Sequence, residues 1–117
     1  MPYERLFQKS YDLVKWVYPT VNKFPRNQRL VLSQRIEVTT IRILELVIDL
    51  KNKDIPVNRK KIINEIKKLQ ILFRLCKDLS FLSLRRYEHV SKLLTEMYQL
   101  LVEGGGDSGD GLHRFVR

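Results

Sequence analysis

The sequence predicts an all-α protein, an antiparallel up-down-up-down four-helix bundle, from two observations. All five glycines lie between Gly104 and Gly111, so the preceding residues lack the residue type that tight turns and phosphate-binding loops use most. Apolar residues recur at steps of three and four along four segments, which is the spacing of one helix face. The connections between these segments are short, and short connections make consecutive helices antiparallel neighbours.

The first helix is expected over residues 3–22, where aromatic and apolar residues repeat at helical steps. Pro19 lies in its last turn and should loosen it, because proline removes a backbone hydrogen bond. Phe24 precedes Pro25 and is therefore disfavoured in the α conformation, whereas Pro25 suits the first turn of a new helix. A tight corner is expected between these two helices, with Phe24 closing the end of the bundle.

The other helices are expected over residues 25–52, 57–79 and 82–103. Apolar residues of the second helix fall on two neighbouring faces, the first with Ile36, Ile43, Val47 and Leu50 and the second with Val38, Ile41, Leu44 and Ile48. A helix with so wide an apolar arc usually packs on two sides. The sequence therefore predicts that the bundle forms a homo-oligomer.

One domain is expected, because 117 residues, 44% of them hydrophobic, suffice for a single core. The bundle should occupy residues 1–103 and a flexible Gly-rich tail residues 104–117. The tail ends in an apolar and basic cluster, Leu112–Arg117, which also suits a segment that docks onto another chain. A single cysteine and the absence of a signal or membrane-spanning segment predict a soluble, cytoplasmic protein.

Positive charge is concentrated in the middle of the chain. The sequence holds 22 Lys and Arg against 13 Asp and Glu, a net charge of +9. Residues 23–52 carry a net +3 and residues 53–81 a net +5, whereas the rest of the chain is almost balanced. Such a charge favours polyanionic partners, and RNA or DNA is the first expectation.

The third helix places its basic residues in rows. Lys60, Lys67 and Arg74 are seven residues apart and share one edge, and Lys61 and Lys68 form a row beside them. A solvated face is the alternative reading, but such a face normally mixes both signs of charge, and few carboxylates interrupt this helix. The candidate binding residues are Lys23, Arg26, Arg29, Arg35, Arg42, Arg59, Lys60, Lys61, Lys67, Lys68, Arg74 and Lys77.

No catalytic or metal-binding constellation is present in the sequence. His89 and His113 have no second histidine or cysteine at ligand spacing, and Cys76 falls on the expected core face. The carboxylates Glu37, Glu45 and Asp49 could suggest a bundle metal site, but the Glu-x-x-His motif that such a site needs is missing. We therefore expect no enzyme activity and no cofactor.

The run YDLVKWVYPTVNKFPRNQRLVLSQRIE, Tyr11–Glu37, resembles the accessory variability determinant proteins of diversity-generating retroelements. These belong to a wider group of four-helix-bundle proteins related to those encoded by intervening sequences in bacterial 23S ribosomal RNA genes. The residues that carry the resemblance are Tyr11, Asp12, Trp16, Pro19, Lys23, Phe24, Pro25, Arg26, Arg29, Arg35 and Ile36. The resemblance implies a barrel-like homopentamer without catalytic activity, which binds the reverse transcriptase of the element and nucleic acid and supports mutagenic cDNA synthesis.

Two other functions are compatible with the sequence. The first is a ribosomal-RNA-associated bundle of the intervening-sequence type that acts without a reverse transcriptase. The second is a structural oligomeric adaptor whose charge serves solubility. A reverse transcriptase encoded near the gene favours the retroelement function, and a ribosomal RNA operon favours the first alternative.

Overall fold

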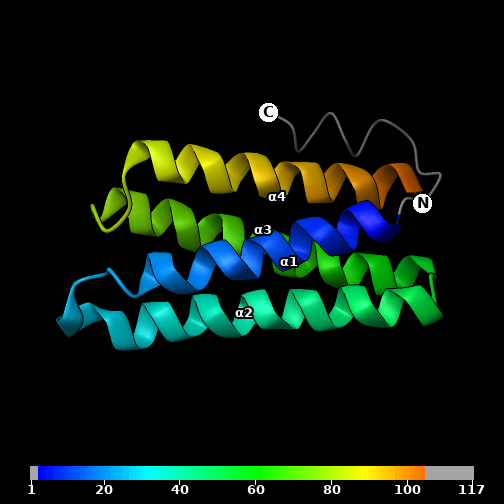
Figure 1. Ribbon diagram of the computed structural model, residues 1–117, viewed down its shortest axis with the longest axis horizontal. Coiled ribbons are helices and arrows are strands. Elements are labelled where there is room, and N and C mark those ends of the chain that lie inside the picture. Colours follow the sequence, from blue (N-terminus) through cyan, green and yellow to red (C-terminus); the bar gives the residue numbers. More distant parts are fainter. Residues whose placement is uncertain (1–2, 105–117) are drawn as a thin grey trace.

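Four helices and their connections make up the part of the chain that the computed structural model describes, residues 3–104, with the backbone alone at 26–30. The helices are α1 (Tyr3–Val21), α2 (Arg26–Asn52), α3 (Pro56–Asp78) and α4 (Leu84–Gly104), and no strand occurs among these residues. Each helix packs against the next and α1 also packs against α4, so the four form a square whose diagonal pairs stay apart. Figure 1 shows α4 and α2 at opposite edges with α1 and α3 between them. The prediction of an all-α four-helix fold is confirmed.

The ends of the helices differ from the expected bounds by one or two residues, for local reasons. α4 begins at Leu84 instead of residue 82 because the Ser83 hydroxyl accepts a hydrogen bond from the Arg86 N–H, at 3.2 Å, as an N-cap residue does. α3 ends at Asp78, and Ser80 follows with a positive φ of 64°. Its neighbour Phe81 donates its N–H back to the Cys76 carbonyl, at 2.8 Å, which is the hydrogen bond of a Schellman motif.

One face of each helix points into a shared apolar core. The largest fully buried side chains are Leu6, Leu13, Ile36, Ile43, Leu50, Ile62, Ile66, Leu69, Phe73, Leu94, Met97 and Leu101. Cys76 is also buried, and burial raises the pKa of its thiol to about 11, as expected of a core cysteine. The predicted flexible tail lies outside the described residues, except that Gly104 belongs to α4.

Phe24 closes one end of the bundle, as the sequence predicts. It lies between α1 and α2 and is buried, with its ring centroid 5.7 Å from that of Phe81 in the α3–α4 connection. Each ring comes from a connection between helices, so the contact joins the two corners at this end. The apolar contact therefore fixes where α2 and α4 begin relative to each other.

Arg59 joins the elements at the other end of the bundle. Its guanidinium is buried and donates to both carboxylate oxygens of Asp54 in the α2–α3 connection. A further guanidinium N–H donates to the Leu101 carbonyl of α4, at 3.0 Å. The hydrogen bond from Arg59 is the main cause that lowers the pKa of the Asp54 carboxyl below its usual value of 3.8.

This lowered pKa predicts how stability depends on pH. Since the folded pKa of Asp54 lies below the unfolded value, the ionised carboxylate stabilises the fold above about pH 4 and loses this effect as the pH falls toward the folded pKa. Asp54→Asn should therefore lower the free energy of unfolding at pH 7 and have little effect near pH 2. Urea titrations at several pH values measure this. In an Arg59→Met background the same substitution should have little effect at any pH, and an equal loss there would contradict the Asp54–Arg59 coupling.

A second prediction concerns Ser33 of α2, whose buried hydroxyl has no hydrogen-bond partner among the residues that the structure describes. A buried polar group without a partner costs stability, so Ser33→Ala should raise the free energy of unfolding by about 1 kcal/mol. Ser10→Ala is the matched control, because that buried hydroxyl donates to the Phe7 carbonyl at 2.8 Å. The two substitutions share the gain in helix propensity, so urea denaturation should rank Ser33→Ala above Ser10→Ala. Equal values would show that the Ser33 hydroxyl is satisfied in solution.

Candidate partner interface

α3 carries its positive charge in two rows. The outer row consists of Lys60, Lys67 and Arg74, and the inner row of Lys61 and Lys68. Members of a row are seven residues apart and lie above one another, because each helical residue turns by about 100°. Lys67 is half-buried and the other four side chains are exposed.

Contacts with the neighbouring helices show which way each row faces. Glu65, one helical turn from Lys61 and Lys68, forms an ion pair with Arg42 of α2, so the inner row lies on the α2 flank. On the opposite flank the ammonium group of Lys77 lies 4.9 Å from the centroid of the Tyr87 ring of α4. The outer row therefore lies on the side of α3 that is turned away from α2.

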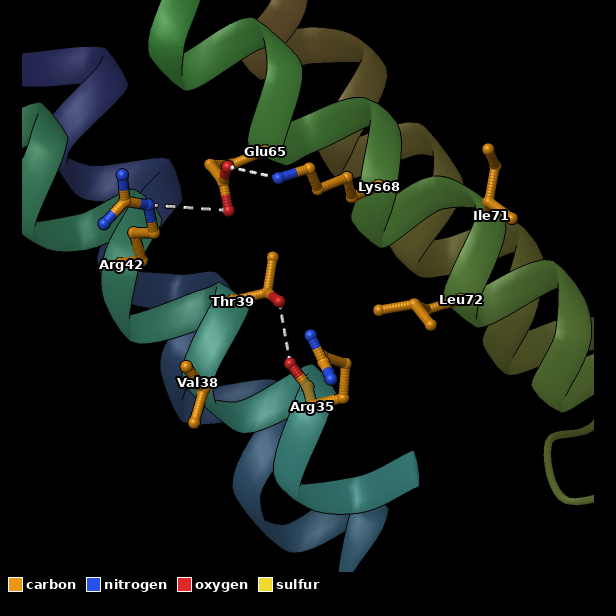
Figure 2. A pocket seen from close by; sticks show the side chains of 8 residues that line it. All are labelled: Arg35, Val38, Thr39, Arg42, Glu65, Lys68, Ile71 and Leu72. Carbon is orange, nitrogen blue, oxygen red and sulfur yellow. Dashed lines mark hydrogen bonds and ion pairs between the residues drawn. The ribbon is translucent and has the colours of Figure 1, made fainter. Parts of the chain in front are cut away.

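An open groove of about 590 Å³ runs between α2 and α3 (Figure 2). The carboxylate of Glu65 lies in this groove. Glu65 as a whole residue is only 8% exposed. One carboxylate oxygen is 3.7 Å from Nε of Arg42 and the other is 3.0 Å from Nζ of Lys68. Two cations thus hold one carboxylate, which leaves the local charge of this cluster positive.

Next to this cluster the groove is apolar. Val38 from α2 and Ile71 and Leu72 from α3 line it, and Val38 and Ile71 are 65% and 69% exposed. Thr39 donates its hydroxyl to the Arg35 carbonyl, at 2.7 Å, so its hydroxyl is already hydrogen-bonded. Among the described side chains, no aromatic residue lines the groove. The groove can therefore accept apolar side chains, and the cations Arg35, Arg42 and Lys68 line it beside them.

The predicted binding residues do not all join this surface. Arg59 is 8% exposed and its guanidinium binds Asp54 and Leu101 within the chain, which favours a structural role. Lys77 is half-buried. Its ammonium group lies over the Tyr87 ring and forms an ion pair with the Asp78 carboxylate, with Nζ and Oδ1 3.5 Å apart.

The basic corner before α2 carries Lys23, Arg26 and Arg29. Lys23 is exposed in the connection between α1 and α2. The backbone of Arg26 and Arg29 lies in the first turns of α2, and their side chains lie outside the described structure.

Phe24 belongs to the core, and the partly buried Trp16 packs against this core. Trp16 packs edge-on against Phe73, with ring centroids 5.7 Å apart and an interplanar angle of 73°, and its other neighbour is His89. Phe24 packs against Phe81. Polyanion binding at this surface would therefore depend on charge and not on base stacking.

The described residues also bear on whether the chain binds a metal ion or crosses a membrane. Within residues 3–104 no group of three or more His, Cys, Asp or Glu side chains is placed to hold a metal ion. In the same part of the chain, none of the helices has the combined length and apolar character that crossing a bilayer requires.

A family model described as bAvd-like matches residues 6–102. The match extends from α1 to α4 and covers most of the chain. The chain belongs to the bAvd-like family. This confirms the resemblance to the accessory variability determinant proteins that residues 11–37 suggest. Comparisons with curated proteins and with solved structures gave no match.

The α2–α3 groove and both basic rows lie within the part of this bAvd-like protein that the family model matches. Sequence reasoning missed Glu65 as the residue that organises the groove. Its position carries a signal, because a lone carboxylate stands beside Ile62 and Ile66 on the core side of a basic helix. A carboxylate in such a place needs cationic neighbours, and Lys68 three residues later is one of them.

Proposed function

We propose that this bAvd-like protein is a non-catalytic accessory subunit of a diversity-generating retroelement. In this role it binds the reverse transcriptase and the nucleic acid of the element in the cytoplasm and supports mutagenic cDNA synthesis. The proposal rests on the family match together with the outer row of α3, which presents basic side chains on the side turned away from α2. The protomer is an antiparallel up-down-up-down bundle, and the resemblance supports a barrel-like homo-oligomer, a pentamer in the family as a whole.

The outer row suits a phosphate backbone. Its members follow one another at about 10 Å along the helix, since seven residues rise by 1.5 Å each. A row of cations can follow the backbone of a strand without contacting the bases, and each neutralised phosphate releases counterions. Binding at this row should therefore weaken steeply with salt and show little sequence preference.

The first test is co-purification with the reverse transcriptase encoded nearest to the gene, at low and high salt and with and without nuclease. A defined complex that survives nuclease and high salt would show direct protein contacts, and loss on nuclease treatment would show bridging RNA. A folded protein that retains ribosomal RNA but no reverse transcriptase would contradict the proposal and support the intervening-sequence alternative.

The second test asks whether RNA binding depends on the position of the outer row or only on the net charge of the protein. Lys60→Glu, Lys67→Glu and Arg74→Glu together should lower RNA affinity at 100 mM salt by about tenfold or more, and should reduce the slope of log affinity against log salt by about two to three. The matched control reverses three exposed cations elsewhere, Arg5, Arg85 and Lys92, and so changes net charge equally. Fluorescence anisotropy with a labelled RNA measures both. Equal losses in the two variants would assign the binding to net charge.

A further inference from the structure

We propose that residues 112–117 of this chain dock onto its own α4, on the outer side where α4 meets α3, and that docking limits the access of RNA to the outer row of α3. The docking itself is independent of the proposed function, whereas its effect on RNA rests on that function. The segment has the sequence LHRFVR, with three apolar residues, and lies outside the described residues. It follows a Gly-rich stretch that begins where α4 ends.

The first observation is that the outer side of α4 becomes covered toward the end of the helix. Residues seven positions apart lie above one another on a helix, so three such rows follow this outer side. Exposure falls along each row from the start of α4 to its end. The rows are Leu84, Ser91 and Tyr98; Glu88, Thr95 and Val102; and Arg85, Lys92 and Gln99. Tyr98 and Val102 are only 5% and 9% exposed, whereas Leu84 is 61% exposed.

The four helices do not account for this cover. α4 packs against α1 and α3 and lies at one edge of the bundle, with no other helix beyond it (Figure 1). Gln99 is half-buried although it lies on the opposite side of α4 from the core residues Met97 and Leu101. Tyr98 and Val102 are buried without belonging to the contiguous apolar core. The chain that directly follows α4 is the nearest candidate for the cover.

Two contacts align α3 with α4. Arg59 of α3 donates to the Leu101 carbonyl near the end of α4, and Lys77 of α3 lies over the ring of Tyr87 near the start of α4. Lys67 is about midway between Arg59 and Lys77 along α3, so it lies beside the middle of α4.

The outer row of α3 is covered at this same level. Its middle member Lys67 is half-buried, whereas Lys60 and Arg74 at its two ends are exposed. The covered region therefore extends from the last turns of α4 onto the middle of the outer row.

The length of the connecting stretch suits docking on the same chain. Residues 105–111 separate Gly104 from Leu112 and span at most about 25 Å, and a Gly-rich chain of this length averages about 15 Å. Tyr98 lies about 9 Å back along the helix axis from Gly104. Six extended residues span about 20 Å, enough to follow α4 from Val102 back to Ser91.

Charges agree with this path. The hydrogen bond from Arg59 to Leu101 brings the first turn of α3 beside the last turn of α4. Asp107 and Asp110, which follow α4 closely in sequence, would therefore come near the exposed Lys60. At the far end of the path the segment's arginines would approach Glu88, an exposed carboxylate on the outer side of α4. Carboxylates and cations thus meet at both ends.

A segment of the same chain suits this surface better than nucleic acid does. Tyr98 and Val102 offer apolar contacts, which a phosphate backbone does not use. A short tether holds a segment at a millimolar effective concentration, so weak apolar contacts suffice for docking.

Docking would lower the positive charge that the outer row presents. It would cover Lys67 and place two carboxylates near Lys60. RNA affinity at such a row depends on the number of cations that neutralise phosphates. The docked chain should therefore bind RNA more weakly than the undocked chain.

The first experiment measures docking by disulfide capture in the full chain. Gln99→Cys with His113→Cys puts one thiol on the covered side of α4 and one in the segment, whose apolar residues stay intact. In a glutathione buffer the effective concentration of this pair should exceed that of Glu4→Cys with His113→Cys by about tenfold or more. Glu4 is the matched control site, because it is exposed and lies on α1 at the same end of the bundle (Figure 1). Cys76 is buried, and peptide mass spectrometry identifies the bonded pair.

A third variant separates docking from mere tethering. Phe115→Ser and Val116→Ser, added to the Gln99 and His113 pair, should lower its effective concentration to that of the control pair. Circular dichroism checks that each variant remains helical. Equal values in the three variants would overturn the inference, and so would a disulfide that joins two chains instead of closing within one.

The second experiment measures the effect of docking on RNA. Fluorescence anisotropy with a labelled RNA at 100 mM salt compares the disulfide-closed Gln99 and His113 pair with the undocked variant Phe115→Ser with Val116→Ser. The undocked variant should bind about fivefold more tightly, which is the order of one additional phosphate contact. Leu84→Ser is the control for loss of an apolar side chain, because Leu84 lies at the uncovered start of α4, and it should leave affinity unchanged. Equal affinities of the closed and undocked chains would overturn the effect on RNA.

These experiments can fail independently of the proposed function. A disulfide that closes as expected in a chain that binds neither RNA nor reverse transcriptase would contradict the accessory role and leave docking intact. A chain that binds RNA and reverse transcriptase but shows equal disulfide capture at Gln99 and Glu4 would overturn docking and leave the accessory role intact.

Discussion

A helix at the corner of a four-helix square can bury only the arc that faces the core, and this constraint governs the rest of the structure. α1 and α4 largely obey it, since most of their apolar residues point inward. α2 and α3 depart from it, because Val31, Val38 and Ile48 of α2 and Val57, Ile71 and Leu75 of α3 remain exposed. An isolated bundle cannot remove that surface from water by repacking, because short connections already fix how its helices lie against one another. The uncovered apolar surface therefore lies on both α2 and α3.

The sequence suffices to predict the four helices and the apolar arc of α2, because both depend on local periodicity. It is less informative at the helix ends. Nothing in the sequence marks Ser80 as the residue that takes a positive φ, a position that glycine usually fills. The start of α4 at Leu84 depends on the cap that Ser83 provides, whereas the apolar pattern alone extends back to residue 82. Local capping interactions thus determine the helix ends, which apolar periodicity does not specify.

The candidate site was predictable in part, for a similar reason. The spacing of seven residues places Lys60, Lys67 and Arg74 in one row whatever the helix packs against. The role of Arg59 could not be predicted, because its partner Leu101 is 42 residues away in the sequence and enters only when α3 and α4 pack. The same holds for Glu65, whose contact with Arg42 requires α2 and α3 to lie side by side. Properties of one helix follow from its sequence, and properties shared between helices follow from their packing.

The charge of the chain is consequently a poor measure of its binding surface. Arg59 is buried by contacts at the bundle end, Lys77 packs on an aromatic ring, and Arg42 and Lys68 share one carboxylate. A cation that already has a carboxylate beside it gains less from a phosphate, because the new contact must compete with the existing one. The row on the far side of α3 stands apart from the Glu65 cluster, so the packing of α3 against α2 divides into two surfaces what the sequence shows as one basic helix.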